Sequence, residues 1–141
     1  MVMNVLFDTS AFYKRYSGEQ GADRVLQLQM GARQVTMAAH CKMEIASALT
    51  RQWREGLFTD AEYSRMLTEI DRDFAELTVM PLTTHVEQRA IAALRQATLR
   101  AVDALHIGTA QIAGVSLFVT ADRRQALAAQ AVGLNTELIE A

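Results

Sequence analysis

The sequence predicts an α/β fold, a three-layer α/β/α sandwich in which a central parallel sheet lies between two layers of helices. Short apolar segments of strand length recur along the chain, and segments with the apolar spacing of helices separate them. Strands of this kind are buried on both faces, which is typical of parallel sheets. The 141 residues contain one proline and no Gly/Ser-rich linker, so we expect a single domain over 1–141.

The first part of the chain is expected to supply two strands and the helices around them. The apolar run at the start predicts a strand, and the turn around Gly18 separates the first two helices. Gly56 is a favourable residue for ending the third helix. The predicted elements are, in order, a strand over 2–7, helices over 9–16 and 22–30, a strand over 34–38 and a helix over 40–55.

The second part contains clear signals for helix ends. Thr59-Asp-Ala-Glu62 and Thr84-His-Val-Glu87 both match the capping box, which predicts that two helices begin there. Gly114 is expected to close an almost uniformly apolar, buried helix. Beyond the two capped helices, the predicted elements are strands over 77–80, 117–120 and 136–139 and helices over 102–113 and 123–132.

The charge balance excludes a protein that grips nucleic acid through a broadly basic surface. There are 14 basic and 16 acidic side chains, for a net charge of −2, so any nucleic acid must be held locally. No apolar run approaches the roughly 18–20 residues of a membrane span. Cys41 is the one cysteine, and the first residues lack the basic segment of a signal peptide. We therefore expect a cytoplasmic protein with no membrane association.

Three acids occupy positions where α/β folds form their sites. Asp8 follows the first predicted strand directly, and Asp122 lies two residues beyond the strand that ends at Thr120. Ligands of such folds bind beyond the carboxyl ends of the strands. Asp103 falls in the first turn of the buried helix. Each acid also has a structural interpretation, since Asp8 and Asp122 suit helix N-caps and Asp103 suits the helix dipole.

Glu44 lies on the apolar stripe of its helix, at i+3 from Cys41 and i−4 from Ala48. A charge there is costly unless something compensates it, and a buried ion pair is the structural alternative. Four carboxylates that converge on one place ionise together only if a cation joins them. Oxygen ligands are those that Mg²⁺ and Mn²⁺ prefer, so the pattern favours such a metal.

The three histidines give weaker signals. His106 is expected to be a hydrogen-bonded core residue. His40 and His85 have no cysteine or histidine at zinc-like spacing, so no zinc site is expected. The segment 13–16 mixes aromatic and basic side chains, which is typical of RNA contacts but equally of a surface for a protein partner.

Four segments together carry a family resemblance. They are Leu6-Phe-Asp-Thr-Ser-Ala-Phe-Tyr-Lys-Arg-Tyr16, Met43-Glu-Ile-Ala-Ser-Ala-Leu49, Leu99-Arg-Ala-Val-Asp-Ala-Leu-His-Ile-Gly-Thr-Ala110 and Leu117-Phe-Val-Thr-Ala-Asp-Arg-Arg124. In this order and spacing the whole chain resembles the PIN-domain family, and within it the VapC toxins of bacterial toxin–antitoxin pairs.

The resemblance implies a site and an activity. Asp8, Glu44, Asp103 and Asp122 would form an acidic quartet that holds one or two Mg²⁺ or Mn²⁺ ions for the hydrolysis of RNA. Thr120 would help to order the site, and we add Thr9 as a second candidate for this role. Arg123 and Arg124, directly after Asp122, are candidates for contacts with substrate phosphates, and a solvated helix face is the alternative. The implied strand order is 3-2-1-4-5, which brings Asp8 next to Asp122. The implied partners are an RNA substrate, a VapB-like antitoxin and a second copy of the chain.

Two other classes of protein remain as alternatives. A phosphate-binding α/β domain of response-regulator type would have an acidic pair after the first strand and a lysine near the last, and this chain has one acid there and no lysine after Lys42. A catalytically silent PIN-like interaction module would need no quartet, and the intact quartet argues against it.

Overall fold

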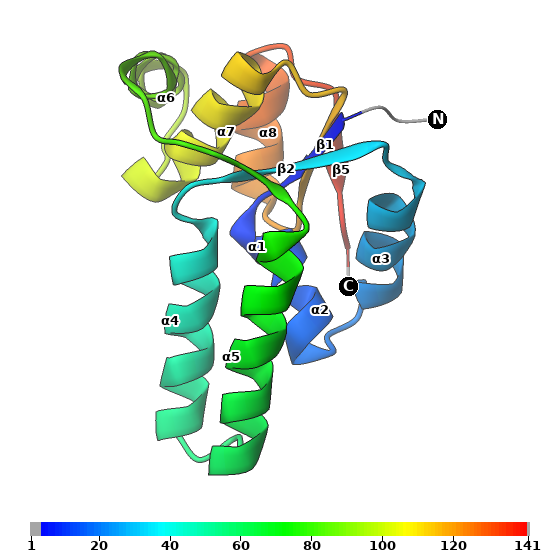
Figure 1. Ribbon diagram of the computed structural model, residues 1–141. Helices are drawn as coiled ribbons and strands as arrows, with labels where there is room; N and C mark the ends of the chain where they lie inside the picture. The colour runs from blue at the N-terminus through cyan, green and yellow to red at the C-terminus, as the bar shows by residue number, and fades with distance from the viewer. Residues whose placement is uncertain (1–3, 141) are drawn as a thin grey trace.

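Five parallel strands form one sheet in the computed structural model, which describes residues 4–140 (Figure 1). The strand order is β3-β2-β1-β4-β5, and every neighbouring pair is parallel. Both properties confirm the predicted sheet. The strands are β1 (Asn4–Phe7), β2 (Gln34–Ala38), β3 (Thr78–Met80), β4 (Leu117–Thr120) and β5 (Thr136–Leu138).

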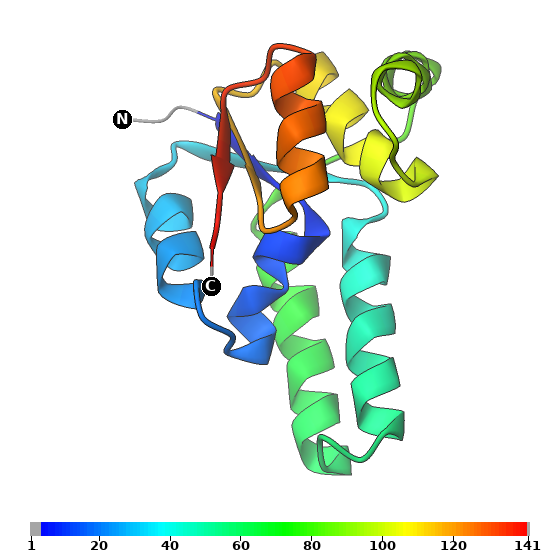
Figure 2. The same cartoon turned by 180° about the vertical axis from the view of Figure 1, so that it is seen from behind.

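The two faces of the sheet contact two separate apolar cores. Because side chains alternate along a strand, Val5 and Phe7 point into one core while Leu6 points into the other. In β4, Val119 and Phe118 divide in the same way. The larger core lies under α1 (Thr9–Phe12), α2 (Lys14–Ser17), α3 (Ala22–Gly31), α4 (Cys41–Arg54) and α5 (Asp60–Ala75), and the smaller under α6 (Thr84–Gln96), α7 (Ala101–Ala113) and α8 (Arg123–Ala131). The three-layer sandwich is therefore confirmed (Figures 1 and 2).

Helices α4 and α5 form a hairpin that extends away from the sheet as an arm (Figures 1 and 2). Near its far end the rings of Trp53 and Tyr63 stack, with centroids 4.7 Å apart. At its base, Tyr16 and Arg15 both contact Asp73, the tyrosine hydroxyl at 2.7 Å and the guanidinium at 3.2 Å. Part of the segment 13–16 thus fastens the arm to the body of the protein.

Helices α6 and α7 approach each other closely at Gly108. A Cβ atom at Gly108 would lie 2.5 Å from the carbonyl oxygen of Val86 and 2.9 Å from the backbone nitrogen of Ala90. Any side chain larger than hydrogen would therefore push the two helices apart. This contact holds α7, which carries Asp103 and His106, against its neighbour.

The helix boundaries contain two corrections. The segment 9–16 forms two short helices, because the backbone hydrogen bonding changes at Tyr13 although its φ and ψ of −57° and −29° remain helical. The capping box expected at Thr84 is wrong, since Thr83 is the N-cap and its hydroxyl accepts from the backbone N–H of Val86 at 3.2 Å. The box at Thr59 and Glu62 is confirmed, with both reciprocal hydrogen bonds present.

Within residues 4–140, no helix combines the length and the apolar character that crossing a membrane requires.

Candidate active site

Asp8 lies at the carboxyl end of β1, and its carboxylate is almost completely buried. Its Oδ1 accepts hydrogen bonds from the Ser10 hydroxyl at 2.7 Å and from the backbone N–H of Ala11 at 3.0 Å. Its Oδ2 accepts from the Thr120 hydroxyl at 2.5 Å. Burial raises the pKa of Asp8 above its ordinary value of 3.8, while nearby His106 and these hydrogen bonds act in the opposite direction. The carboxylate is rigidly oriented and is also the N-cap of α1.

Thr120 and Ser10 join Asp8 to the segment that carries Asp122. The oxygen of Thr120 accepts the backbone N–H of Asp122 at 3.1 Å, and the oxygen of Ser10 accepts that of Ala121 at 2.9 Å. The carboxylate of Asp122 is exposed and accepts from the backbone N–H groups that begin α8. Both aspartates therefore cap helices, as the structural interpretation of the sequence expected. They follow adjacent strands at one edge of the sheet.

Glu44 lies in the first turn of α4 and is half-buried against α7. Its Oε1 lies 2.5 Å from the Thr9 hydroxyl, 3.0 Å from Nε2 of His106 and 3.3 Å from Nε2 of His40. Burial alone would raise the pKa of Glu44, but the hydrogen bonds from His106 and Thr9 and the two imidazoles outweigh it and lower the pKa below 4.5. The predicted core histidine, His106, is thus the main partner of this acid.

Asp103 lies in the first turn of α7 and is partly exposed. Its two carboxylate oxygens accept from the guanidinium of Arg100 at 3.1 and 3.3 Å. The backbone carbonyl of Asp103 accepts from the buried amide of Gln125 at 2.9 Å, which ties α7 to α8. The hydrogen bond and charge of Asp103 raise the pKa of Arg100, and the charges of Glu44 and Asp122 add to this shift. One cation therefore lies in the field of three of the four acids.

Carboxylate oxygens suit a hard divalent ion, and two of the four acids, Asp8 and Asp122, follow neighbouring strands at one edge of the sheet. The described residues contain a different group that is already close together, because ligand atoms of His40, Glu44 and His106 all lie within 4.8 Å of one another. The guanidinium of Arg100 provides positive charge beside Asp103. A bound divalent ion would add further positive charge at the same place. The carboxylate oxygens of these residues fit Mg²⁺ or Mn²⁺ through their donor chemistry.

Several residues of the site were not singled out from the sequence. Ser10 binds the Asp8 carboxylate, and Arg100 neutralises Asp103. A signal for Arg100 existed, because it precedes Asp103 by three residues at the start of a helix, the spacing of a side-chain pair. His40 and His106 meet at Glu44 across a gap of 66 residues in the chain, which local spacing does not reveal.

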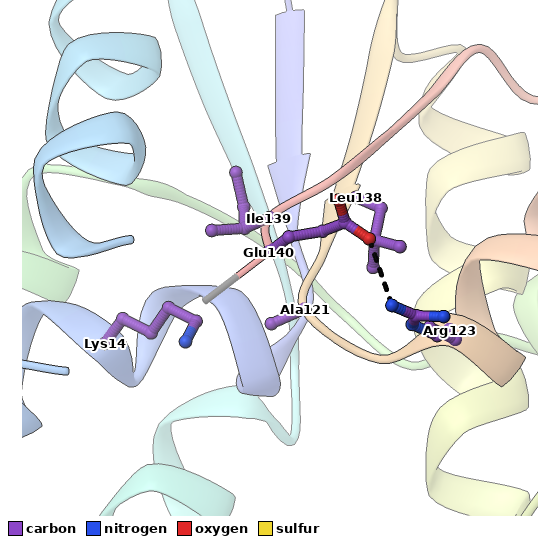
Figure 3. A pocket seen from close by; sticks show the side chains of 6 residues that line it. All are labelled: Lys14, Ala121, Arg123, Leu138, Ile139 and Glu140. Carbon is purple, nitrogen blue, oxygen red and sulfur yellow. Dashed lines mark hydrogen bonds and ion pairs between the residues drawn. The ribbon is translucent and has the colours of Figure 1, made fainter. Parts of the chain in front are cut away.

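Arg123 and Lys14 border a hollow of about 370 Å³ beside the ends of β4 and β5. Figure 3 shows the two side chains on opposite sides of it. Arg123 pairs with Glu140 at 3.3 Å, and both side chains are exposed. Lys14 is buried, and its ammonium donates to the backbone carbonyl of Gln20 at 2.9 Å. Arg124 is exposed and lines a second hollow between α8 and the segment 96–98 at the end of α6.

A family model described as the PIN domain matches residues 5–131 of this chain. The chain belongs to the PIN-domain family. The match spans β1 through α8, and so includes every one of the four predicted acids. The resemblance inferred from the four sequence segments is confirmed at the level of the family.

Curated relatives and solved structures extend over most of this PIN-domain chain. It is 30% identical to ribonuclease VapC45 of Mycobacterium tuberculosis over 131 residues, which cover 92% of this chain and 91% of the relative. The crystal structure of VapC20 of the same organism, a sarcin-ricin loop cleaving toxin, superposes with a TM-score of 0.68 at 17% identity, covering 92% and 95% of the chains. A toxin–antitoxin complex from Klebsiella pneumoniae gives 0.66 at 16% identity, covering 86% and 88%.

Proposed function

We propose that this protein is a metal-dependent endoribonuclease that acts as the toxin of a toxin–antitoxin pair. The observation that carries the proposal is that Asp8 and Asp122 follow the adjacent strands β1 and β4 of a PIN-domain sheet, while the charges of Asp103, Glu44 and Asp122 all act on Arg100. The names of the relatives support it, since VapC45 is a ribonuclease and VapC20 is a toxin that cleaves the sarcin-ricin loop. Asp103 is partly exposed and Asp122 is exposed, which leaves both carboxylates accessible to a large substrate.

In this proposal Asp8 and Asp103 are the principal ligands of Mg²⁺ or Mn²⁺, and Glu44 and Asp122 bind directly or through water. The bound ion supplies an activated water and neutralises charge that develops on the phosphate. Thr120, Ser10 and the backbone N–H of Ala11 hold the Asp8 carboxylate in one orientation. Such supporting contacts fix the geometry of a site before substrate arrives.

The chain's own cations would bind RNA locally. Arg123 is exposed at the first position of α8, beside Asp122, where it can exchange its pair with Glu140 for a phosphate. Exposed ion pairs of this kind contribute little stability, so the exchange costs little. Arg124 is its exposed neighbour. Phosphate contacts of arginine are planar and bidentate, which suits a protein whose net charge is −2.

The decisive experiment measures cleavage of a mixed RNA pool with Mg²⁺ or Mn²⁺ and with chelator. Wild type should cleave only with metal, and Asp8→Asn should lower the rate by at least about 100-fold, the scale of losing a key electrostatic group. Asp23→Asn is the matched control, since Asp23 is an exposed first-turn acid on α3, and it should cleave like wild type. Cleavage that is equal in all three proteins, or absent from wild type with either metal, would contradict the proposal.

The toxin role includes two proposed partners, a VapB-like antitoxin and a second copy of the chain in a homodimer. The Klebsiella structure, a toxin–antitoxin complex, supports the first part. Expression of the chain alone in a bacterial cell should arrest growth, and Asp8→Asn should relieve the arrest. Normal growth with abundant folded wild-type protein would instead favour a catalytically silent interaction module.

A further inference from the structure

Three side chains from three chain segments surround one oxygen of Glu44 at the base of the arm. His40 lies at the N-cap of α4 one turn before Glu44, and His106 comes from the buried face of α7. The two imidazole rings lie 4.3 Å apart, and Thr9 completes the group from α1. His40 and Glu44 also line an open hollow of about 450 Å³, so solutes reach the cluster.

The polar contacts in this cluster outnumber the hydrogen atoms that are available to form hydrogen bonds. Glu44 Oε1 contacts Thr9 Oγ1 and the Nε2 atoms of both histidines. Thr9 Oγ1 also lies 3.1 Å from Nε2 of His106, and Nε2 of His40 lies 2.8 Å from the carbonyl oxygen of Val102. These five contacts have three hydrogens between them, one on Thr9 and at most one on each Nε2. A positive ion among the same atoms would satisfy the lone pairs that the hydrogens leave over.

The geometry of the three ligand atoms fits a tetrahedral transition-metal ion. Two donors bound to one Zn²⁺ at its usual bond lengths lie about 3.3–3.6 Å apart in a tetrahedron. Oε1 of Glu44 lies 3.3 Å from Nε2 of His40 and 3.0 Å from Nε2 of His106, and all three atoms lie within 4.8 Å of one another. Both oxygen–nitrogen distances are within a few tenths of an ångström of this separation, and three protein ligands would leave the fourth corner to water.

The ligand types select against Mg²⁺. Imidazole nitrogen binds Zn²⁺ and its transition-metal neighbours, whereas Mg²⁺ and Ca²⁺ prefer oxygen donors. Two histidines and one glutamate also form the protein ligand set of well-known zinc sites with one open position. This set is distinct from the four-carboxylate site, although the two share Glu44.

We infer that His40, Glu44 and His106 form a binding site for Zn²⁺ or a similar transition-metal ion, and that this ion competes with the proposed Mg²⁺ site for Glu44. Binding requires both histidines to be neutral with their lone pairs at Nε2, so the His40 contact to Val102 is given up. The inference that the ion restrains RNA cleavage rests on the proposed function. The inference that it binds does not.

Zn²⁺ binding is tested first, with protein stripped of metal by chelator and with no RNA. Titration calorimetry should show one Zn²⁺ per chain in wild type, also when millimolar Mg²⁺ is present. Co²⁺ in place of Zn²⁺ should give the intense visible absorption of a four-coordinate ion. His40→Gln should weaken Zn²⁺ binding by at least about 100-fold, because loss of a ligand exceeds the 10–100-fold effect of losing an outer-shell partner.

His85→Gln is the matched control, since His85 is exposed on α6 outside the cluster. It should bind Zn²⁺ like wild type. His40 is the better residue to change than His106, whose side chain is only 1% exposed and whose replacement would disturb the core. A thermal melt of each variant confirms that it is folded. Equal Zn²⁺ affinity of His40→Gln and wild type, or no binding by folded wild type, would overturn the site.

The shared ligand is tested separately, by adding Zn²⁺ to RNA cleavage that Mg²⁺ supports. Wild type and His85→Gln should lose most of their activity at Zn²⁺ concentrations that fill the site. His40→Gln should keep a larger fraction of its own activity at the same concentrations. Inhibition of the same fraction in all three proteins would contradict the competition for Glu44. The conclusion about Zn²⁺ binding, which is measured without RNA, would not be affected.

Discussion

The hydroxyl of Thr120, at the end of β4, donates a 2.5 Å hydrogen bond to Oδ2 of Asp8, at the end of β1. The same oxygen accepts the backbone N–H of Asp122 at 3.1 Å. Thr120 is completely buried, so water does not replace either contact. One threonine thus connects two of the four candidate acids and fixes the direction of the buried carboxylate.

Replacement of Thr120 by valine tests this connection. Thr120→Val keeps the shape of the side chain but removes the hydroxyl that donates to Oδ2 of Asp8 and accepts the backbone N–H of Asp122, at a cost of about 1–3 kcal/mol for each buried group left without its partner. RNA cleavage should fall by about 10–100-fold, as for other outer-shell partners. Urea unfolding and cleavage rates measure the two effects. Thr120→Ser keeps the hydroxyl and is the control; if valine and serine behave alike, the hydrogen bond has no role.

The pKa of His40 predicts how stability depends on pH. Burial, and next the neighbouring His106, lower this pKa below its ordinary value of 6.5, although Glu44 acts in the opposite direction. The unfolded chain therefore takes up this proton at higher pH than the folded protein. The stabilising contribution is complete above pH 6.5 and is lost as the pH falls toward the folded pKa.

His40→Gln should therefore make the free energy of unfolding less dependent on pH in the window that begins near pH 6.5 and extends downward to the folded pKa. The pKa of Glu44 is lowered from 4.5, so its own titration lies below this window. Urea unfolding in chelator at several pH values gives the slope for each protein. His85→Gln should keep the slope of wild type. If the free energy of unfolding of His40→Gln depends on pH as steeply as that of wild type, His40 has the same pKa in the folded and the unfolded protein, which would contradict the prediction.

The close approach of α6 and α7 makes Gly108 a test of packing. Ala in place of Gly favours a helix by about 0.8–1 kcal/mol, so Gly31→Ala, at the end of α3 with no atom within 4 Å of the new Cβ, should be neutral or stabilising. Gly108→Ala should be destabilising by about 1–3 kcal/mol, because its Cβ meets the backbone of α6. Chemical unfolding of both variants measures the difference. Equal changes in the free energy of unfolding at the two positions would mean that α6 and α7 move apart without loss of stability.

Local patterns were sufficient to predict most of the fold and the place of two acids. An acid that follows a buried parallel strand must lie at the carboxyl edge of the sheet, which is why the place of Asp8 was predictable, whereas the strand order was implied only by the family resemblance. The helix of Glu44 was equally clear, and so was the need for a compensating partner. Which residue supplies that partner depends on how α7 packs against α4, and apolar periodicity indicates the buried face of a helix but not its register against another.

The contacts of His106 and Arg100 illustrate what local patterns leave open. His106 was predictable as a buried, hydrogen-bonded residue, but its partner Glu44 lies 62 residues earlier in the chain. Arg100 is an exposed residue before a helix, where an arginine is ordinary, and only the fold brings Glu44 and Asp122 near it. The N-cap of α6 is Thr83, although Thr84 was expected. Both threonines fit a similar local sequence pattern, and the path of the backbone in the folded protein decides which one caps the helix.

The central claim is that the four carboxylates share one divalent ion, and thermal unfolding in Mg²⁺ tests it without any substrate. Mg²⁺ separates this site from the histidine cluster because it prefers oxygen ligands. An ion that binds only the folded protein stabilises it by about 2.7 kcal/mol at 100 times its Kd. Asp103→Asn removes one ligand charge but keeps an oxygen that can accept from Arg100.

The measurement compares the melting temperatures of wild type, Asp103→Asn and Asp23→Asn in chelator and in increasing Mg²⁺. Asp23 and Asp103 both lie in the first turn of a helix, so the two variants lose the same favourable interaction with a helix dipole. Wild type and Asp23→Asn should gain stability equally as Mg²⁺ increases, and Asp103→Asn should gain much less. Equal gains in all three proteins, or no gain in wild type, would contradict the shared metal site.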